Sequence, residues 1–582
     1  MIVRHLTSVG NAEKEVDQEL GFLLRSGTLD YLSLYPSQTT RYAGWFVWRE
    51  SQGGHFVKIL EHIQPLTAKG DIDAVVGLTL TEFQAVWELA SGAKLAFVPL
   101  RGRSGVHIMA STPTRLRILL DPRHTYRHPS LVEREITTSL QGTSLSVMVS
   151  DPNLEAPIAI NVRSSGGLTL IEQATTVNYS RDAARHSPPE SKEVLILAET
   201  TTTSLMLGAA DNLNLAEQYS LQAGQQQFMI PAELSVDHGR PVELPHIAER
   251  AALSTLERLR TPTGFWAGLP WFHQQWTRDT LVAALGMRRD DQFECIQHAI
   301  GMRLDNGQLP TYIGSNSSCS DGLLWLCLLV REYGLNDLDP VTQARLEHLL
   351  IQAHTELSMR RAHHGLIESG KNATWMDTPG REGFPIEIQA GFLLALELLY
   401  ELTFDPRVAS ERLQLRSVIE KEYLQQGMLA DRLGDPICRP NLFIAYLAAP
   451  DLLSEISWRS VFTHALEKLW LPWGGLSTID TSNPAFHAVS MGESNESYHN
   501  GDSWMMINCL ASVALKRFGG FAAQASQLVS GATEEILWKN IAGAAGETQA
   551  AGNGDSWGCG VQAFSAGPYL WALKEHELSL KK

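Results

Sequence analysis

Hydrophobic positions follow two different periods along the chain. In the first 235 or so residues, short runs dense in β-branched residues alternate in part with polar ones, as in Ser144–Val149 (SLSVMV), Ile158–Val162 (IAINV) and Val194–Leu207 (VLILAETTTTSLML). Gly, Asn, Asp and Pro bound these runs, a pattern typical of β-strands. We therefore predict an N-terminal antiparallel β-sandwich domain over residues 1–235.

From Pro241–Pro245 (PVELP) onward, the hydrophobic positions have the period of an α-helix. Convincing strand patterns are missing between the helical segments, which excludes a doubly wound sheet and a TIM barrel. At roughly 28 residues for a helix and its loop, residues 236–582 hold about twelve helices. Segments with this period include Ile247–Leu259, Thr280–Met287, Leu323–Tyr333, Ala344–Leu357, Pro385–Leu402, Ser460–Leu469, Ser503–Phe518 and Ala566–His576.

Composition and charge narrow the function classes. The chain has 582 residues, 44% of them hydrophobic and 19% charged, with 47 Lys and Arg against 64 Asp and Glu for a net charge of −17. These values are typical of a globular protein with two or more domains. The negative charge disfavours a nucleic-acid partner, because such binding depends on Lys and Arg that neutralise phosphates.

Cysteine usage and the N-terminus indicate a cytoplasmic protein. The six cysteines form neither a CxxC pair nor a zinc spacing, so no structural metal and no disulfide framework is expected. The first residues lack the apolar stretch of a secretory signal, and no segment approaches about 18 uninterrupted apolar residues. We therefore expect no membrane association.

Tryptophan is concentrated in the helical part, where twelve of the fifteen lie at or after Trp266. A tryptophan is often only part of a core, but several here lie in polar, Gly-rich connections. Indole faces stack on the apolar faces of sugar rings, whose hydroxyls need polar partners nearby. The tryptophans in such connections are Trp266, Trp271, Trp276, Trp375, Trp473, Trp504 and Trp557.

The first of four polar clusters is Gly268–Thr280 (GLPWFHQQWTRDT), immediately before a predicted helix. Arg278 and Asp279 place a fork of hydrogen-bond donors beside an acceptor, which suits adjacent sugar hydroxyls. The alternative is that Asp279 caps the helix while Arg278 is structural.

The second cluster is Gly365–Leu396, where Trp375 and Asp377 lie in a loop ahead of a helix that carries Glu387 in its first turn. An acid beside an indole can stay protonated, because desolvation raises the pKa of a carboxyl, and it can then protonate a leaving oxygen. The alternative for Glu387 is simple complementation of the helix N-terminus.

The third cluster, Tyr498–Trp504 (YHNGDSW), also opens a predicted helix; its alternative is an Asn-Gly turn with Asp502 as a helix cap. The fourth is the long Gly-rich loop Gly543–Leu570, in which Glu547 is the only glutamate. Loops of this length inside a compact domain are more often functional than idle.

These clusters, in this order, resemble the motifs of the amylo-α-1,6-glucosidase domain of glycogen debranching enzymes over residues 265–571. The segment at residues 39–49 (TTRYAGWFVWR) is weakly similar to the family's N-terminal β domain. The resemblance implies a β-sandwich followed by an (α/α)6 toroid of twelve helices. Further similar segments are GQLPTYIGSNSSCSDGLLWL (307–326), ATWMDTPGREGFPIEIQAGFLLAL (373–396), CRPNLFIAYL (438–447), PWGGLSTID (472–480) and GCGVQAFS (558–565).

The resemblance also implies roles for individual residues. Asp377 matches the family's general acid, and Glu547, twelve residues before Cys559, matches the general base. Similar toroid enzymes invert the anomeric centre with two carboxyls about 6.5 to 9.5 Å apart, and they need no metal or cofactor. Positions expected to bind substrate are Trp276, Arg278, Asp279, Asp321, Trp325, Trp375, Glu387, Arg439, Asn441, His499, Asn500, Trp504 and Gln562.

We therefore predict an inverting glycoside hydrolase that releases terminal glucose from α-1,6 branch points of an oligosaccharide or a glycogen-type limit dextrin. One alternative is a trehalase-like, glucoamylase-like or invertase-like enzyme in a similar helical barrel. Another is a catalytically silent carbohydrate-binding protein. Departures from the family motifs predict altered substrate choice or diminished activity, and they fall at Thr277, Gln389, Ser477 and Phe564.

Overall fold

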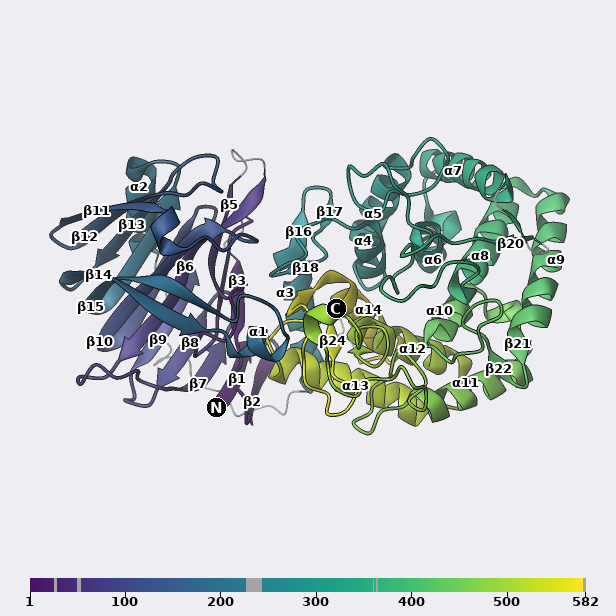
Figure 1. Cartoon of the computed structure of the whole chain (residues 1–582). Coiled ribbons are helices and arrows are strands. Elements are labelled where there is room, and N and C mark those ends of the chain that lie inside the picture. The colour runs from purple at the N-terminus through teal and green to yellow at the C-terminus, as the bar shows by residue number, and fades with distance from the viewer. Residues whose placement is uncertain (26–28, 50–53, 227–242, 360, 363–364, 579–582) are drawn as a thin grey trace. The chain divides into compact units, whose positions relative to one another are not determined.

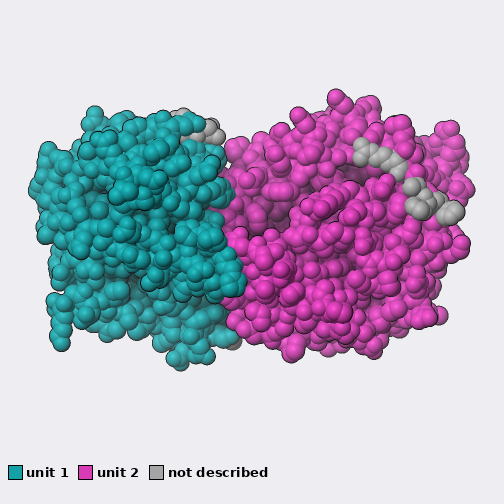
Figure 2. All heavy atoms as spheres, viewed as in Figure 1, with its two compact units in different colours: residues 1–250, 537–544 teal, residues 251–536, 545–582 magenta. Residues whose placement is uncertain are grey.

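The chain divides into two compact units in its computed structural model (Figure 1). The structure describes residues 1–25, 29–49, 54–226, 243–359, 361–362 and 365–578. Unit 1 comprises Met1–Arg250 and Leu537–Ala544, and unit 2 comprises Ala251–Ile536 and Ala545–Lys582 (Figure 2). The predicted domain boundary at 235/236 lies outside the described residues.

Unit 1 is rich in β-strands, as predicted, and its described strands form one network of fifteen. The three runs with the strand pattern become β12, β13 and β15. The strands are β1 (Ile2–Thr7), β2 (Gly10–Glu15), β3 (Phe22–Arg25), β4 (Tyr31–Leu34), β5 (Gly44–Arg49), β6 (His55–Leu66), β7 (Val75–Leu80), β8 (Ala85–Leu89), β9 (Lys94–Pro99), β10 (Gly105–His124), β11 (Glu135–Gln141), β12 (Ser144–Ser150), β13 (Ile158–Ser164), β14 (Leu168–Asn178) and β15 (Ser191–Ala210).

Two long strands divide this network into branches. The first half of β10 pairs with β9 and its second half with β6, while β15 pairs with β14 through its first half and with β13 through its second. Phe22 of β3, in one branch, packs against Trp87 and Phe97 of the other, with ring centroids 5.9 and 5.3 Å apart. All three rings are fully buried, so they belong to the core of the unit.

One ladder departs from the predicted antiparallel arrangement. Strand β1 pairs in parallel with β7, and Ile2 lies opposite Gly77. A parallel pair requires a long crossover connection, and the chain from β2 to β6 supplies it. The prediction of antiparallel strand pairing is therefore wrong for this one ladder.

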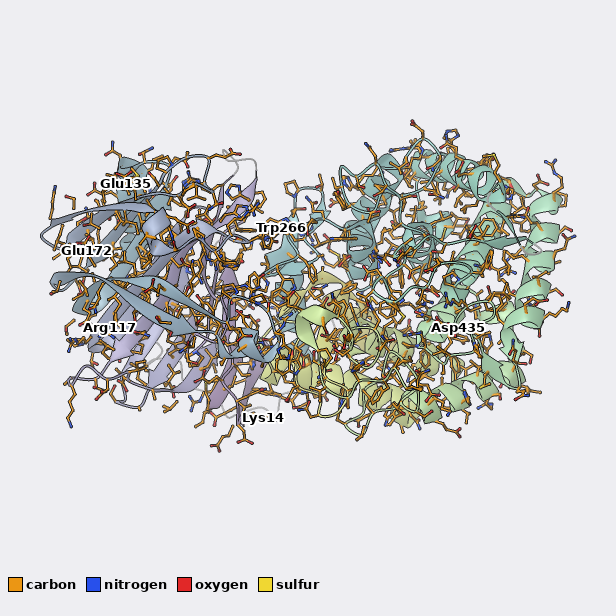
Figure 3. The ribbon with its side chains drawn as sticks, in the orientation of Figure 1. Lys14, Arg117, Glu135, Glu172, Trp266 and Asp435 are labelled. Atoms are coloured by element: carbon orange, nitrogen blue, oxygen red, sulfur yellow. The ribbon has the colours of Figure 1, made fainter. Side chains whose placement is uncertain are left out.

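Three charged side chains form an ion-pair cluster across two neighbouring strands of the sheet, β10 and β15. Arg115 and Arg117 of β10 both donate to the carboxylate of Glu199, which lies opposite Arg117 on β15. Figure 3 labels Arg117, together with Glu135 and Glu172 of the same unit. Such cross-strand ion pairs keep this part of the sheet compatible with solvent.

A short segment from far along the sequence completes unit 1. The carbonyl of Asn540 accepts a 2.8 Å hydrogen bond from the amide of Gly21, and the Asn540 side chain accepts one of 2.7 Å from the hydroxyl of Tyr35. His5 bonds the carbonyl of Leu537 at 2.8 Å. The local sequence pattern does not show that Leu537–Ala544 belongs to unit 1, because the preceding helix has the same period as its neighbours.

Two helices belong to the N-terminal part, α1 (Ser180–Ala184) and α2 (Leu213–Gln225), and twelve more follow among the described residues after 243. No described helix combines the length and the hydropathy that a membrane span requires. The twelve are α3 (Leu244–Leu259), α4 (Thr277–Ala284), α5 (Arg289–Gly301), α6 (Gly322–Tyr333), α7 (Pro340–Met359), α8 (Ile386–Thr403), α9 (Pro406–Tyr423), α10 (Asn441–Ala448), α11 (Glu455–Leu469), α12 (Met505–Phe518), α13 (Ala522–Trp538) and α14 (Ala563–Glu575).

Six of these helices form a closed series of contacts. Helix α4 packs against α6, α6 against α8, α8 against α10, α10 against α12, α12 against α14, and α14 against α4. They are buried almost all round, as the continuous apolar run in α6 (GLLWLCLLV) requires. By contrast, α9 buries only one stripe, Val408, Leu415, Ile419 and Tyr423, because most of its other positions are polar.

The sequence predicts about twelve helices in this part, but four of the observed ones coincide with no segment named from the pattern: α5, α9, α10 and α13. In α9 the polar residues dilute the apolar stripe, while α10 has eight residues of which seven are buried, so no periodic contrast exists to detect. Packing against neighbouring helices, which local pattern does not show, stabilises these elements.

Candidate active site

Two short ladders join three of the four polar clusters. Before α4, β18 (Gly268–Leu269) pairs with β25 (Val561–Gln562), which leads into α14. Before α12, β23 (Ser503–Trp504) pairs with β24 (Thr548–Gln549), the strand that follows Glu547. The first, third and fourth clusters therefore meet where three helices of the closed series begin.

Arg278 connects the first cluster to the second. Its Nη1 lies 3.3 Å from Oδ2 of Asp321, and its Nη2 lies 3.9 Å from Oδ2 of Asp377. Arg278 lies in the first turn of α4, and Asp321 is the residue before α6. One buried guanidinium thus orients carboxyls from two loops.

Asp377 differs from the neighbouring acids in its access to solvent, because about a third of its side chain (34%) is exposed. Burial of the rest raises the pKa of Asp377, and the positive charge of Arg278 partly offsets that rise. The carboxyl is therefore both reachable and biased toward its protonated form.

Glu547 is bound in a way that stabilises its ionised form. Its Oε1 accepts a 2.6 Å hydrogen bond from the hydroxyl of Tyr498, and its Oε2 accepts a 2.8 Å bond from the amide of Cys559. The residue is 3% exposed, and its carbonyl accepts a bond from the amide of Met505, the first residue of α12. Donors to both side-chain oxygens favour the carboxylate over the acid.

Tyr498 is near both carboxyls. Its pKa is raised well above the ordinary value, first by burial, then by the charge of Glu547 and the bond to it, and further by the charge of Asp377. We call the surroundings of this phenol the common region: Glu547 accepts its hydrogen bond, and the charge of Asp377, 170 positions away in the sequence, contributes to its raised pKa.

A third carboxyl, that of Asp279, is also part of this region. Burial raises the pKa of Asp279 to about 7, opposed by Arg278 and reinforced by the charges of Glu547 and Asp321. Helix α4 begins at Thr277 after Trp276, so Asp279 is inside the helix and does not cap it. The capping alternative for Asp279 is wrong.

Aromatic rings from the second and third clusters pack together. The rings of His499 and Trp504 stack at 5.0 Å, and Trp375 meets them edge-on at 5.5 and 5.4 Å. His499 also bonds the hydroxyl of Thr378 at 2.6 Å, which fixes the residue beside Asp377. Burial and the nearby charge of Arg439 lower the pKa of His499 well below its ordinary value.

Behind Trp375 lies a buried ionic network. The indole Nε1 of Trp375 donates to Asn441 at 2.8 Å, and Asn441 donates to Asp431 at 2.8 Å. Arg381 binds Asp431 at 2.7 and 2.9 Å and Glu387 at 2.8 and 3.0 Å. Glu387 lies in the first turn of α8, as predicted, but both its oxygens are bound to Arg381.

Arg439 holds the third cluster in place. It donates to the carbonyls of His499 at 2.5 Å and Thr478 at 3.0 Å, and to Oδ1 of Asn500 at 2.9 Å. Asp502 accepts from the hydroxyl of Ser497 at 2.9 Å, and α12 begins only at Met505. The alternative of Asp502 as a helix cap is therefore wrong.

The remaining predicted residues lie on the same loops and helix starts. The guanidinium of Arg278 lies 5.3 Å from the ring of Trp276, and the indole of the fully buried Trp325 donates to Asp321 at 3.3 Å. Gln562 lies opposite Gly268 in the first ladder. Among the residues predicted to bind substrate, three buried atoms lack a hydrogen-bond partner within the described part of the chain and could bind hydroxyls: Asp321 Oδ1, His499 Nε2 and Gln562 Oε1.

Sequence reasoning did not single out Tyr498, Thr378, Arg381 or Asp431. The first three lie inside the polar clusters, so a search for donors near each carboxyl would have found them. Asp431 lies outside every cluster, and only the fold brings it to Arg381.

Comparison with known proteins identifies the family. The family model described as amylo-alpha-1,6-glucosidase matches residues 250–570, and the chain belongs to this family. It is therefore a glycoside hydrolase, with a carbohydrate as its substrate class. No curated protein matches the chain.

Solved structures similar to the chain include a GH63 mannosylglycerate hydrolase from Thermus thermophilus in complex with Tris. It is 15% identical over 56% of this chain and 99% of that chain, with a TM-score of 0.46. Another is a wild-type glycosidase, 14% identical over 58% of this chain and 98% of that chain, with a TM-score of 0.45.

Proposed function

We propose that the protein removes a terminal glucosyl residue by hydrolysis with inversion, and that Asp377 and Glu547 are its catalytic pair. The proposal rests on one observation: the two carboxyls around Tyr498 differ in their exposure and in their hydrogen-bond donors. Asp377 is part-exposed with a raised pKa, whereas Glu547 is buried with a donor on each oxygen.

In the proposed reaction, Asp377 donates its proton to the glycosidic oxygen as the bond to the anomeric carbon breaks. Glu547 accepts a proton from a water molecule as that water attacks the anomeric carbon from the opposite face. The water oxygen bonds to the sugar and the leaving group departs with the proton from Asp377. Inversion requires about 6.5 to 9.5 Å between the carboxyls, which leaves room for the water.

The surrounding residues take two proposed roles. Residues at the common region are proposed to bind sugar hydroxyls or stack on the ring: Trp276, Arg278, Asp279, Asp321, Trp375, His499, Asn500, Trp504 and Gln562. Trp325, Glu387, Arg439 and Asn441 donate to or accept from other protein groups, so we propose that they position the first set.

The closed series of six helices, separated in sequence by α5, α7, α9, α11 and α13, supports an (α/α)6 toroid. The buried rings of Phe22, Trp87 and Phe97 support a sandwich in unit 1.

For the substrate we propose the α-1,6-linked glucosyl stub of a glycogen-type limit dextrin, with glycogen-derived oligosaccharides as smaller substrates. The family membership supports this choice. A panel of panose, isomaltose and phosphorylase-treated limit dextrin against trehalose, maltose and sucrose tests it. Glucose release from the α-1,6 substrates at a kcat/KM at least tenfold above the others is expected, and preference for trehalose, maltose or sucrose contradicts it.

A further inference from the structure

A groove apart from the residues proposed for catalysis is lined by α11, by α13 and by the turn that follows α11. Figure 1 shows the two helices within unit 2. Its volume is about 720 Å³, within the range of small-molecule sites. Three aromatic residues, Trp470, Trp473 and Phe521, line it together with the carboxamides of Gln524 and Gln527. None of the residues proposed for catalysis lines this groove.

Local backbone geometry fixes one of the indoles. The Trp473 ring lies against Gly475, where a Cβ would come within 2.2 Å of it, and against Gly554, where a Cβ would come within 3.0 Å. Its Nε1 donates to the carbonyl of Ala551 at 2.9 Å. Gly474 has φ of +97°, and a Cβ there would come within 2.7 Å of the Gln527 side chain, so glycine lets that side chain approach the turn. Trp473 is thus held in place without a ligand.

The groove extends along α11. A second hollow of about 430 Å³ shares Thr463 and Glu467 with the first and reaches Ile456. From Ile456 to Trp470 the helix rises about 21 Å at 1.5 Å for each residue. An elongated surface of this length suits an extended ligand better than a single small molecule.

Charge and polarity indicate the class of ligand. Among the described residues that line the larger hollow, Glu467 is the one charged side chain, so no cation is present there to bind a phosphate or a carboxylate. The smaller hollow adds His464 and Arg459, and the guanidinium of Arg459 pairs with Glu455 at 3.0 Å. Flat aromatic faces with neighbouring carboxamides match the apolar faces and hydroxyls of neutral sugars.

We propose that this groove is a second carbohydrate site, which binds a neutral glucan chain apart from the catalytic pair. The proposal rests on the proposed function for its choice of glucan. Such a site holds a polymeric substrate to the enzyme, so it lowers KM for the polymer and leaves hydrolysis of a trisaccharide unchanged.

Native gel electrophoresis with glycogen in the gel tests binding in the full chain. The chain carries Asp377→Asn, so that glycogen is not hydrolysed during the measurement. Trp470→Ala is expected to weaken the retardation at least fivefold, and Tyr400→Ala, which removes an exposed aromatic ring elsewhere in unit 2, is expected to leave it unchanged. The double variant Gln524→Ala/Gln527→Ala provides a second disruption if Trp470→Ala is unfolded by circular dichroism.

In the otherwise wild-type chain, Trp470→Ala is expected to raise KM for glycogen several-fold and to leave kcat/KM for panose within twofold. Retardation by glycogen that both groove variants retain overturns the proposal, as does an absence of retardation in the parent chain. If the chain binds glycogen through the groove but releases no glucose from any substrate, the glucan site stands and the proposed hydrolysis fails.

Discussion

The hydroxyl of Tyr498 donates a 2.6 Å hydrogen bond to Oε1 of Glu547, and the charge of Asp377 acts on the same phenol. This relationship links a side chain that the sequence did not single out to both proposed catalytic carboxyls. It also distinguishes the two carboxyls, because the hydroxyl of Tyr498 donates its hydrogen bond to Glu547.

Tyr498→Phe removes the donor to Glu547 while it preserves the ring. We expect kcat to fall about 10- to 100-fold with KM changed less than threefold, because the lost bond stabilises the ionised base. The acid limb of the pH profile of kcat is expected to move to higher pH, since Glu547 then holds its proton more tightly. An unchanged acid limb contradicts the role given to Tyr498.

Asp377→Asn and Glu547→Gln each remove one proposed proton transfer. We expect kcat to fall by about 10² to 10⁴ in either variant, with substrate affinity largely retained. Steady-state glucose release and isothermal titration calorimetry measure the two effects. Glu382→Gln, which changes an exposed acid five residues after Asp377 in the sequence, is the control and is expected to keep its turnover. A variant that retains near-normal turnover loses its assigned role.

Arg278→Gln tests the electrostatics of the proposed acid. Arg278 lowers the pKa of Asp377, so its removal raises that pKa further and keeps the carboxyl protonated to higher pH. The alkaline limb of kcat/KM is therefore expected to move to higher pH, even as the overall rate falls. Arg278→Lys retains the charge and is expected to keep the limb near its wild-type position. Movement of the limb to lower pH in Arg278→Gln rules out Asp377 as the acid.

Asp431→Asn tests the buried ionic network by stability. At pH 7 we expect a loss of about 2 to 3 kcal/mol in the free energy of unfolding, because Arg381 keeps one charged partner and loses the other. Urea unfolding followed by circular dichroism measures it. Asp435→Asn, which disrupts a partly exposed pair with Arg432, is the control and is expected to cost less than about 1 kcal/mol.

The same variant carries a pH signature. The charge of Arg381 lowers the pKa of Asp431 in the folded protein against the opposing effect of burial. A lowered pKa contributes stability above the ordinary value of 3.8, and that contribution is lost as pH falls through the folded value. The gap between wild type and Asp431→Asn is therefore expected to narrow below about pH 4. A gap that widens there shows that Asp431 is not stabilised as a carboxylate.

Sequence reasoning predicted the strand-rich and helical parts of the chain because strand and helix periods are local properties. It predicted Glu387 in the first turn of α8 for the same reason, but not its pairing with Arg381, which depends on a loop conformation. The parallel pairing of β1 with β7 and the placement of Leu537–Ala544 in unit 1 depend on contacts between distant segments. The positions of Asp377 and Glu547 as one catalytic pair stay a prediction.

Stereochemistry tests the central claim most directly. Proton NMR of the first glucose released from panose in D₂O distinguishes the two anomers before mutarotation mixes them. A water activated by Glu547 on the face opposite the bond that Asp377 protonates gives β-glucose first. If α-glucose appears first, the enzyme retains configuration, and these two carboxyls do not act as the acid and base of an inverting hydrolysis.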